Sequence, residues 1–227
     1  MATTPQIRRL PSLASQVYDS LRAEIVGGRL PAGGRVVVER VAAQLGVSPT
    51  PVREALARFL QEGVICEATP GRLQVVPLTS RYVTDTFLVR SALEGLAAEL
   101  AAPCITAAQL DSLREALKVT ATAFASGDAT AHGATDALLH RTICAAAGNG
   151  ILARELGALQ IHVDFIRSYA QRRNGEHQRR SHEEHVQLLD AFVRRDLVAA
   201  RNAMERHIRD ASARIVHLIN FDGVDPD

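Results

Sequence analysis

The chain has 227 residues, of which 47% are hydrophobic and 22% are charged, and its formal net charge is +1. This apolar content is enough for a sizeable core and excludes a disordered chain. The near balance of charge excludes a wholly basic nucleic-acid coat and an acidic solvating chain. No apolar run approaches the roughly 18 residues of a membrane span, and the three cysteines are too widely spaced for a secreted disulfide framework. We therefore expect a cytoplasmic protein of one large or two modest domains with no membrane partner.

Basic side chains are unevenly distributed along the chain. Residues 1–77 contain nine arginines and six acidic residues, whereas residues 78–227 contain seventeen basic and nineteen acidic residues. Every basic residue except Lys118 is an arginine, whose planar fork suits phosphate groups and guanine edges. The distribution favours an N-terminal segment that meets an anion, although a difference this small is also compatible with chance.

Short elements separated by glycine and proline are expected before Pro77. Apolar residues recur at helical spacing from Leu13 to Ile25, and the two glycines that follow end this helix. Two short apolar runs later in the segment, separated by a turn at 68–72, predict a β-hairpin. The expected elements are helices at 12–26, 39–45 and 48–61 and strands at 64–67 and 73–76.

Long helical patterns with few glycines follow Pro77. Each pattern has one apolar and one polar face, as in the stripe that runs from Met204 to Leu218 in the last of them. We therefore predict a mainly α protein with two domains, at 1–77 and 78–227, the second an all-helical bundle. The expected helices of the second domain span 80–101, 106–125, 129–147, 151–171, 176–194 and 197–219.

The two short helices and the hairpin together predict a winged helix-turn-helix over residues 1–77. The second helix of such a motif lies in the major groove of DNA, where base edges present a distinct pattern of donors and acceptors. Its N-terminal end carries the hydroxyls of Ser48 and Thr50, followed one turn later by Arg53. We expect Ser48 to cap this helix through the N–H of Thr50, because the prolines on either side of Thr50 lack an N–H.

Six side chains of this segment are candidates for DNA contacts. Arg53 is the best placed for a bidentate contact with guanine, and Arg40 on the preceding helix is within reach of a base or a phosphate. Contacts with the DNA backbone are expected for Arg58 and Arg72, for which a solvated surface charge is the alternative. The expected DNA-binding residues are Arg40, Ser48, Thr50, Arg53, Arg58 and Arg72.

Two runs of this segment, GRLPAG at 28–33 and QLGVSPTPVREAL at 44–56, resemble the GntR family of bacterial transcription regulators. The resemblance covers most of the N-terminal segment. It implies a winged domain that binds operator DNA, with the arginines that match Arg40 and Arg53 reading bases.

The sequence departs from the family pattern at two places. Pro49 stands where many relatives have an arginine, so one expected base contact is missing. The wing is also poorer in basic residues, because Ala68 and Gly71 occupy positions where arginines are common. We therefore do not expect the operator sequence of relatives to apply to this protein.

Three histidines and one aspartate of the C-terminal segment form a candidate metal site. Asp136 and His140 are four residues apart, so both side chains project from one face of a helix. His185 and His207 lie among apolar residues of two later helices, which predicts that they face the inside of a bundle. Three imidazoles and one carboxylate suit a divalent metal, with zinc preferred and nickel or manganese as alternatives. Four helix-face polar residues with ordinary hydrogen-bond partners are the competing interpretation.

Three further runs, VRSALEGLAA at 89–98, LLDAF at 188–192 and AMERH at 203–207, are similar to the FCD effector-binding domain of the FadR-like branch of the same family. This resemblance implies an all-helical bundle that senses a small organic acid, with a divalent metal in the cavity. It also implies that each of the four candidate residues stands where the family has a metal ligand.

Arg90 and Asn149 are the expected effector-binding residues. Arg90 lies on the inward side of an otherwise apolar helix, with Glu94 one turn later, and a buried arginine requires a partner. In the functional interpretation Arg90 and the metal share a carboxylate ligand, which the arginine clamps bidentately. A surface Arg90–Glu94 pair is the alternative. Asn149, at a helix junction, would add one hydrogen bond.

The remaining histidines are expected to be solvated or locally paired. His182 and His185 flank two glutamates, but the metalloprotease motif needs histidines four residues apart and these are three apart. Cys144, four residues after His140, is expected to be a small buried apolar residue rather than a ligand. The histidines interpreted in this way are His132, His162, His177, His182 and His217.

These features together predict a ligand-responsive transcription regulator, with repression relieved by the effector as the expected sign. A homodimer would place two recognition helices about one DNA turn apart on a palindromic operator, and a small carboxylate would bind at the metal in the helical domain. Two other functions remain. One is a metal-dependent hydrolase or lyase whose metal activates water, for which no separate general base is apparent. The other is an architectural DNA binder whose helical body only dimerises.

Overall fold

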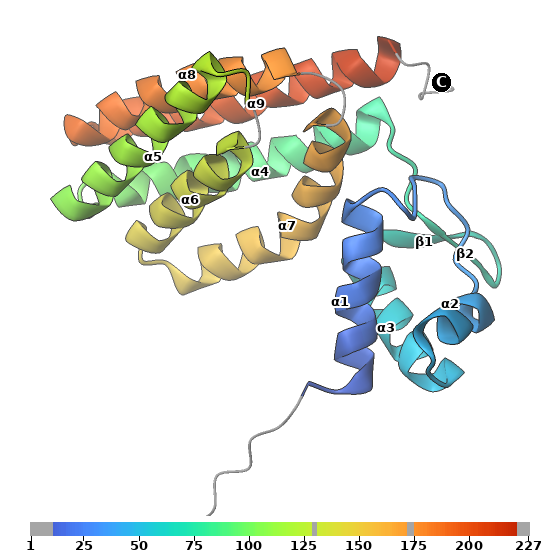
Figure 1. Ribbon diagram of the computed structural model, residues 1–227. Coiled ribbons are helices and arrows are strands. Elements are labelled where there is room, and N and C mark those ends of the chain that lie inside the picture. Colours follow the sequence, from blue (N-terminus) through green and yellow to red (C-terminus); the bar gives the residue numbers. More distant parts are fainter. Residues whose placement is uncertain (1–10, 129–130, 172–174, 222–227) are drawn as a thin grey trace, which may run out of the picture. The chain divides into compact units, whose positions relative to one another are not determined.

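The computed structural model describes residues 11–128, 131–171 and 175–221, and Figure 1 shows their arrangement. The chain divides into two compact units, Met1–Pro77 and Leu78–Asp227. The first consists of helices and a two-stranded sheet, and the described part of the second is helical. The predicted fold class is therefore confirmed. None of the described helices combines the length and the hydropathy needed to cross a membrane.

The first unit contains α1 Leu13–Val26, α2 Val38–Leu45, α3 Pro49–Glu62, β1 Ile65–Thr69 and β2 Arg72–Val75. These elements follow in the predicted order. Gly46 ends α2 with a left-handed φ of 65°, which glycine adopts without steric cost, so the chain turns sharply into α3. The strands of the hairpin pair antiparallel, with Ile65 opposite Val75.

An aromatic pair joins α1 to α3 at the centre of the first unit. Tyr18 of α1 stacks on Phe59 of α3 with ring centroids 4.4 Å apart, and Phe59 is fully buried. The Tyr18 hydroxyl donates to Glu62 at 2.7 Å, and the Arg58 guanidinium lies 3.6 Å from the centroid of the Tyr18 ring. Because these contacts hold one face of α3 against α1, they determine which face of α3 is exposed.

The predicted capping bond of Ser48 is wrong. Ser48 occupies the N-cap position of α3 with an extended backbone, but its side chain makes no capping hydrogen bond. Pro49 at the first helical position fixes φ near the helical value and has no N–H that needs a partner. The helix therefore starts without the Ser48 hydroxyl, which remains exposed.

The described part of the second unit contains α4 Ser80–Ala101, α5 Ala107–Ala125, α6 Ala131–Ala146, α7 Gly150–Gln171, α8 Gly175–Val193 and α9 Leu197–Phe221. These are the six helices that the sequence predicts, with bounds that differ by a few residues. The predicted start of the third of them at Ala129 lies outside the described residues. Helices α4 and α9 run side by side along the unit, and α4 also packs against α6 and α7 (Figure 1).

Close packing between α4 and α9 depends on a glycine. A Cβ atom at Gly95 would lie 2.6 Å from Cγ of Glu205 on α9. One turn earlier, the Ser91 hydroxyl donates to the backbone carbonyl of Glu205 at 3.3 Å. The small residues of α4 therefore bring α9 close enough to place its buried face, which includes His207, inside the bundle.

Gly95→Ala is expected to be less stable than Gly157→Ala by about 1–3 kcal/mol, because the added methyl group overlaps Glu205 and overpacking costs that much. Gly157 is the matched control, since it also lies inside a helix and a Cβ there meets no atom within 4 Å. Urea unfolding measures both free energies of unfolding. Shortening Glu205 to Ala in the Gly95→Ala background should restore part of the loss. Equal stability of the two alanine variants would contradict this account of the packing.

Candidate functional site

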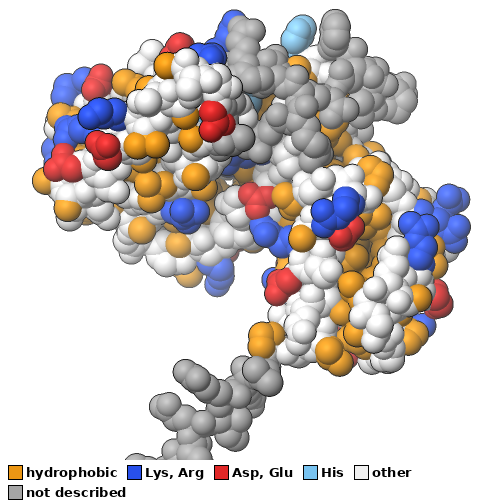
Figure 2. Space-filling model, in the orientation of Figure 1, with side chains coloured by type: hydrophobic (Ala, Val, Ile, Leu, Met, Phe, Trp, Pro, Cys, Tyr) orange, Lys and Arg blue, Asp and Glu red, His pale blue; other side chains and the backbone are white. Residues whose placement is uncertain are grey.

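The exposed end of α3 carries the side chains that the sequence predicts for base contacts. Ser48, Thr50 and Arg53 are exposed, as is Arg40 on α2. Arg53 Nη2 lies 3.7 Å from Glu39 Oε1, and the two side chains are 62% and 71% exposed. An ion pair this open to water contributes little, so Arg53 can exchange it for another partner. Figure 2 shows basic side chains at the surface beside α2 and the hairpin.

Arg58 and Arg72 have different surroundings. Arg58 Nε donates to Glu62 at 2.9 Å, and its guanidinium also lies over the Tyr18 ring, so Arg58 has partners within its own unit. Arg72 begins β2 in the wing and is exposed. The turn of the wing is made by Gly71 with a φ of 75°, where other residues are strained. DNA backbone contacts remain predictions for both arginines.

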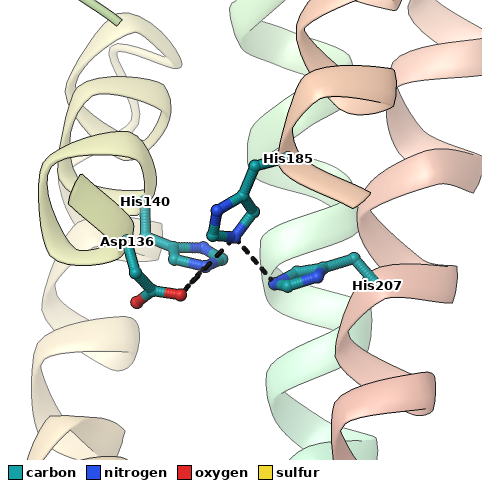
Figure 3. A group of neighbouring side chains, drawn as sticks. All are labelled: Asp136, His140, His185 and His207. Atoms are coloured by element: carbon teal, nitrogen blue, oxygen red, sulfur yellow. Dashed lines mark hydrogen bonds and ion pairs between the residues drawn. The ribbon is translucent and has the colours of Figure 1, made fainter. Parts of the chain in front are cut away.

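Three helices bring the four candidate metal ligands together inside the second unit (Figure 3). Asp136 and His140 come from α6, His185 from α8 and His207 from α9, and each offers one ligand atom within 4.8 Å of the others. The Nε2 atoms of His185 and His207 are 3.2 Å apart. Asp136 Oδ1 lies 3.5 Å from Nε2 of His185 and 3.6 Å from Nε2 of His140. We call these four residues the Asp–His cluster.

Two glutamates hold the outer sides of two imidazoles of the Asp–His cluster. Glu94 Oε2 contacts Nδ1 of His140, and Glu184 Oε2 contacts Nδ1 of His207 at 2.7 Å. A carboxylate accepts hydrogen bonds and does not donate them, so each Nδ1 carries the proton and each Nε2 faces the centre of the cluster. Carboxylate–histidine pairs of this kind orient metal-binding imidazoles.

Two arginines hold these glutamates in turn. Arg90 Nε donates to Glu94 Oε1 at 2.6 Å, and both residues are buried. Arg214 donates to both oxygens of Glu184, at 2.5 and 2.9 Å. Although burial by itself raises the pKa of Glu94, the positive charge of Arg90 and the contact with His140 hold it well below its usual range. The Arg90–Glu94 pair is thus formed, but it is buried and not at the surface as the alternative interpretation had it, and effector binding by Arg90 remains a prediction.

Burial favours the neutral form of the imidazoles at the centre of the cluster. It lowers the pKa of His185 well below its usual value, and the neighbouring His207 and His140 lower it further. The pKa of His207 is lowered well below its usual value as well, first by burial and then by His140. Neutral imidazole is the form that binds a metal ion.

The donor set fits a divalent cation. Nε2 of His140 is buried and makes no hydrogen bond with any residue that the structure describes. Such a group costs about 1–3 kcal/mol when left without a partner. Arg167 contacts the Oδ2 atom of Asp136, which leaves Oδ1 as the oxygen nearest the imidazoles. Three imidazole nitrogens and one carboxylate oxygen on converging side chains match the ligands of zinc and similar metals.

His132 corrects the expectation that the other histidines are solvated or locally paired. It is buried, its ring lies over that of His185 with centroids 5.7 Å apart and planes at 16°, and burial lowers its pKa to about 4. Its position four residues before Asp136 was a usable signal, because residues at that spacing share a helix face. His162 does have a local partner, since its Nδ1 contacts the Tyr82 hydroxyl at 2.5 Å.

A cavity of about 670 Å³ lies between α6 and α7 beside the Asp–His cluster, with Arg90, Glu94, His140 and Arg167 in its lining. Arg167 was not anticipated from the sequence. It contributes a second guanidinium next to Arg90, and burial lowers its pKa to about 9, so it is charged at neutral pH. A second space of about 20 Å³, roughly one water molecule, is lined by Arg90, His132 and Arg167 among others.

Asn149 and Cys144 have more ordinary surroundings. Asn149 is exposed, and its Oδ1 accepts the backbone N–H groups of Ile151 and Leu152 at 3.1 Å each. It therefore caps the start of α7, and an effector contact by Asn149 remains a prediction. Cys144 is partly buried and lines the large cavity, where burial raises the pKa of its thiol.

The two units define a class of protein: a winged helix-turn-helix with an exposed recognition helix, followed by a helical domain with a cavity and a cluster of ligand-type side chains. Residues 13–72 match the family described as bacterial regulatory proteins, gntR family, and residues 85–210 match the FCD domain. The chain belongs to the GntR family of bacterial regulatory proteins, and its second unit contains an FCD domain.

Similar proteins are transcription regulators. The chain is 34% identical over 209 residues to the "Probable D-xylose utilization operon transcriptional repressor" of Paenarthrobacter nicotinovorans. This match covers 91% of this chain and 90% of that protein. It is 33% identical over 117 residues to the HTH-type transcriptional regulator McbR of Escherichia coli (strain K12), over 52% and 53% of the two chains. The solved structure of E. coli McbR/YncC matches with a TM-score of 0.74 and 26% identity over 92% of this chain and 99% of that one. The protein is a regulator and not an enzyme, so the hydrolase or lyase interpretation is set aside.

Proposed function

We propose that this protein is a cytoplasmic repressor that binds operator DNA as a homodimer and releases it when a small carboxylate binds at a metal in the FCD domain. The observation that carries the proposal is the position of the Asp–His cluster, whose member His140 lines a cavity of about 670 Å³ together with Arg90 and Arg167. Two relatives are named as repressors. One is the protein from Paenarthrobacter nicotinovorans, and the other is RspR of Escherichia coli (strain K12), to which this chain is 24% identical over 216 residues.

The exposed end of α3 supports operator binding. Ser48 and Thr50 present hydroxyls at a helix N-terminus, where the helix dipole attracts phosphate. Arg53 follows one turn later, and because its ion pair with Glu39 is exposed it is available for guanine. In the same proposal Arg40 contacts a base or a phosphate, and Arg72 contacts the backbone from the wing.

The outer face of α4 supports a homodimer. Leu88, Ala92, Leu96 and Leu100 follow at four-residue spacing and are exposed, Leu88 by 63%. An exposed apolar stripe of this kind is typical of a surface that binds another protein chain. A two-fold dimer would present two recognition helices about 34 Å apart, which matches half-sites one DNA turn apart.

The Asp–His cluster supports metal and effector binding at one place. A bound divalent cation, zinc or alternatively nickel or manganese, would supply positive charge and a position for carboxylate oxygens. The chain's own contribution is orientation, since Glu94 and Glu184 hold the imidazoles of His140 and His207. Arg90 and Arg167 line the same cavity and are proposed to donate to the effector carboxylate. The side-chain oxygen of Asn149 caps α7, so Asn149 would contact an effector only through its NH₂ group.

An effector changes DNA affinity only by the difference between its affinities for the two forms of the protein. Repression is relieved when the acid binds more tightly to the form that does not bind DNA. If no acid changes operator affinity, the helical domain serves only for dimerisation, as in the architectural interpretation.

Arg53→Ala is expected to weaken operator binding by about 1–3 kcal/mol, or roughly 5- to 150-fold in Kd, because one bidentate base contact is lost. Fluorescence anisotropy with a duplex selected by the wild-type protein from random-sequence DNA measures the affinity. Arg154→Ala is the charge-matched control, since Arg154 is 70% exposed on α7, and it should bind like the wild type. Wild-type affinity and sequence preference in Arg53→Ala would refute the assigned role.

His185→Ala and His207→Ala are expected to abolish stoichiometric metal binding, because each removes one of four converging donors. Elemental analysis of protein purified without added metal, and again after loading with zinc, measures the bound metal. His217→Ala is the matched control, since His217 is exposed near the C-terminal end of α9. This variant should retain the metal. Full metal content in both cluster variants would overturn the metal site.

Glu184→Gln is expected to retain the metal but to bind it about 10- to 100-fold more weakly, because the neutral amide orients His207 less strongly than the carboxylate does. Competition with a chromogenic zinc chelator measures the affinity. Glu183→Gln is the neighbouring control, since Glu183 is exposed. If Glu184→Gln matches the control in zinc affinity, then Glu184 does not position His207.

A further inference from the structure

The large cavity beside the Asp–His cluster is bounded by one face of each of two helices. Helix α7 contributes residues from Ala153 to Arg167, and α6 contributes residues from Ala137 to Ala145. Along α7 these positions span about 20 Å at 1.5 Å per residue. The cavity volume of about 670 Å³ falls within the usual range for small-molecule sites.

Charged groups gather at the end of the cavity next to the Asp–His cluster. Arg90 is paired with Glu94, and Arg167 with Asp136, so these four side chains together carry no net charge. A divalent cation at the cluster therefore leaves this end with excess positive charge, which a carboxylate would offset.

Apart from Arg141 of α6, the rest of the cavity wall offers little to a polar ligand. Leu156 and Val163 of α7 are aliphatic, and Ala145 and Cys144 of α6 are small and weakly polar. The two polar side chains on this part of α7 already bond to each other, because Gln160 donates to Asp164 at 2.7 Å. Hydroxyl groups of a bound ligand would lose water there without gaining equivalent hydrogen bonds, which opposes binding.

Gly157 is the strongest indication that this wall accommodates a ligand body. A glycine inside a helix costs stability relative to alanine, and it usually has a packing reason, as Gly95 does against Glu205. Gly157 lines the cavity, and a Cβ there would meet no atom within 4 Å. Among the residues that the structure describes, no contact and no positive φ therefore requires the glycine, and its missing side chain enlarges the cavity.

We propose that the effector is a monocarboxylic acid with an apolar body, an aliphatic or aryl-alkyl acid, whose carboxylate lies at Arg90, Arg167 and the metal and whose body lies along Gly157 and Leu156. This inference rests on the proposed function and specifies the class of its effector. It excludes polyhydroxylated acids and tricarboxylic acids as the preferred ligands.

Isothermal titration of the zinc-loaded full chain with six probes tests the ligand class. The probes are octanoate, 4-phenylbutyrate, acetate, D-gluconate, citrate and D-xylose. Octanoate and 4-phenylbutyrate are expected to bind at least about tenfold more tightly than the others, because each buried CH₂ group adds affinity. D-Xylose is included because the name of one relative refers to its utilisation. Gluconate, citrate or xylose binding as tightly as octanoate overturns the inference.

Gly157→Leu tests the position of the apolar body. The leucine occupies open space, so the variant should fold as well as the wild type, yet its affinity for octanoate should fall at least about tenfold while acetate binds unchanged. Gly150→Leu on the same helix is the control, since Gly150 also has no atom within 4 Å of a Cβ and does not line the cavity described here. Wild-type octanoate affinity in Gly157→Leu contradicts the inference.

The outcomes separate this inference from the proposed function. If polar acids bind at Arg90 and relieve operator binding while octanoate does not, then the effector-responsive repressor stands and its effector class is different. If none of the acids binds the zinc-loaded protein or changes its operator affinity, then both the effector function and the inference fail.

Discussion

Two partly buried carboxylate–histidine pairs are the interaction on which the chemistry of the helical domain depends. Glu94 holds Nδ1 of His140 and Glu184 holds Nδ1 of His207, and an arginine pairs with each glutamate. Breaking a buried ion pair leaves an uncompensated charge at considerable cost, so each pair fixes the ring orientation and the proton position of its histidine. The Nε2 atoms of His140 and His207 therefore face the centre of the cluster. The glutamates that orient these rings are themselves paired with arginines.

The DNA-binding unit obtains its geometry in a different way. Its exposed surface is determined by the backbone, since Gly46 turns the chain between the two helices and Pro49 starts the second. The Tyr18–Phe59 stack then fixes the buried face of α3. Exposed side chains such as Arg53 contribute little to this packing, so the base contacts of this helix can change without loss of stability.

The elements of the fold could be predicted because their signals are local in the sequence. Helical periodicity and glycine positions gave each helix to within a few residues, and the four-residue spacing of Asp136 and His140 placed both on one face. The contacts that tune the cluster were not predictable in this way. Arg167 and Glu184 act on residues of other helices, and which faces meet depends on helix rotation and packing. The position of His132 on the same helix face could have been predicted from its spacing, since it precedes Asp136 by one turn.

Charge balance connects the metal to the acid in the proposed site. Glu94 and Asp136 balance the charges of Arg90 and Arg167, so a divalent cation at the cluster adds positive charge that these four side chains do not offset. A carboxylate that contacts the metal and the arginines removes part of that excess in a place shielded from water, where such interactions are strong. Binding free energies are reciprocal, so an acid that binds more tightly because the metal is present must tighten metal binding by the same factor. In the proposed function the protein would then respond more strongly to the acid when metal occupies the cluster, because each ligand strengthens the binding of the other.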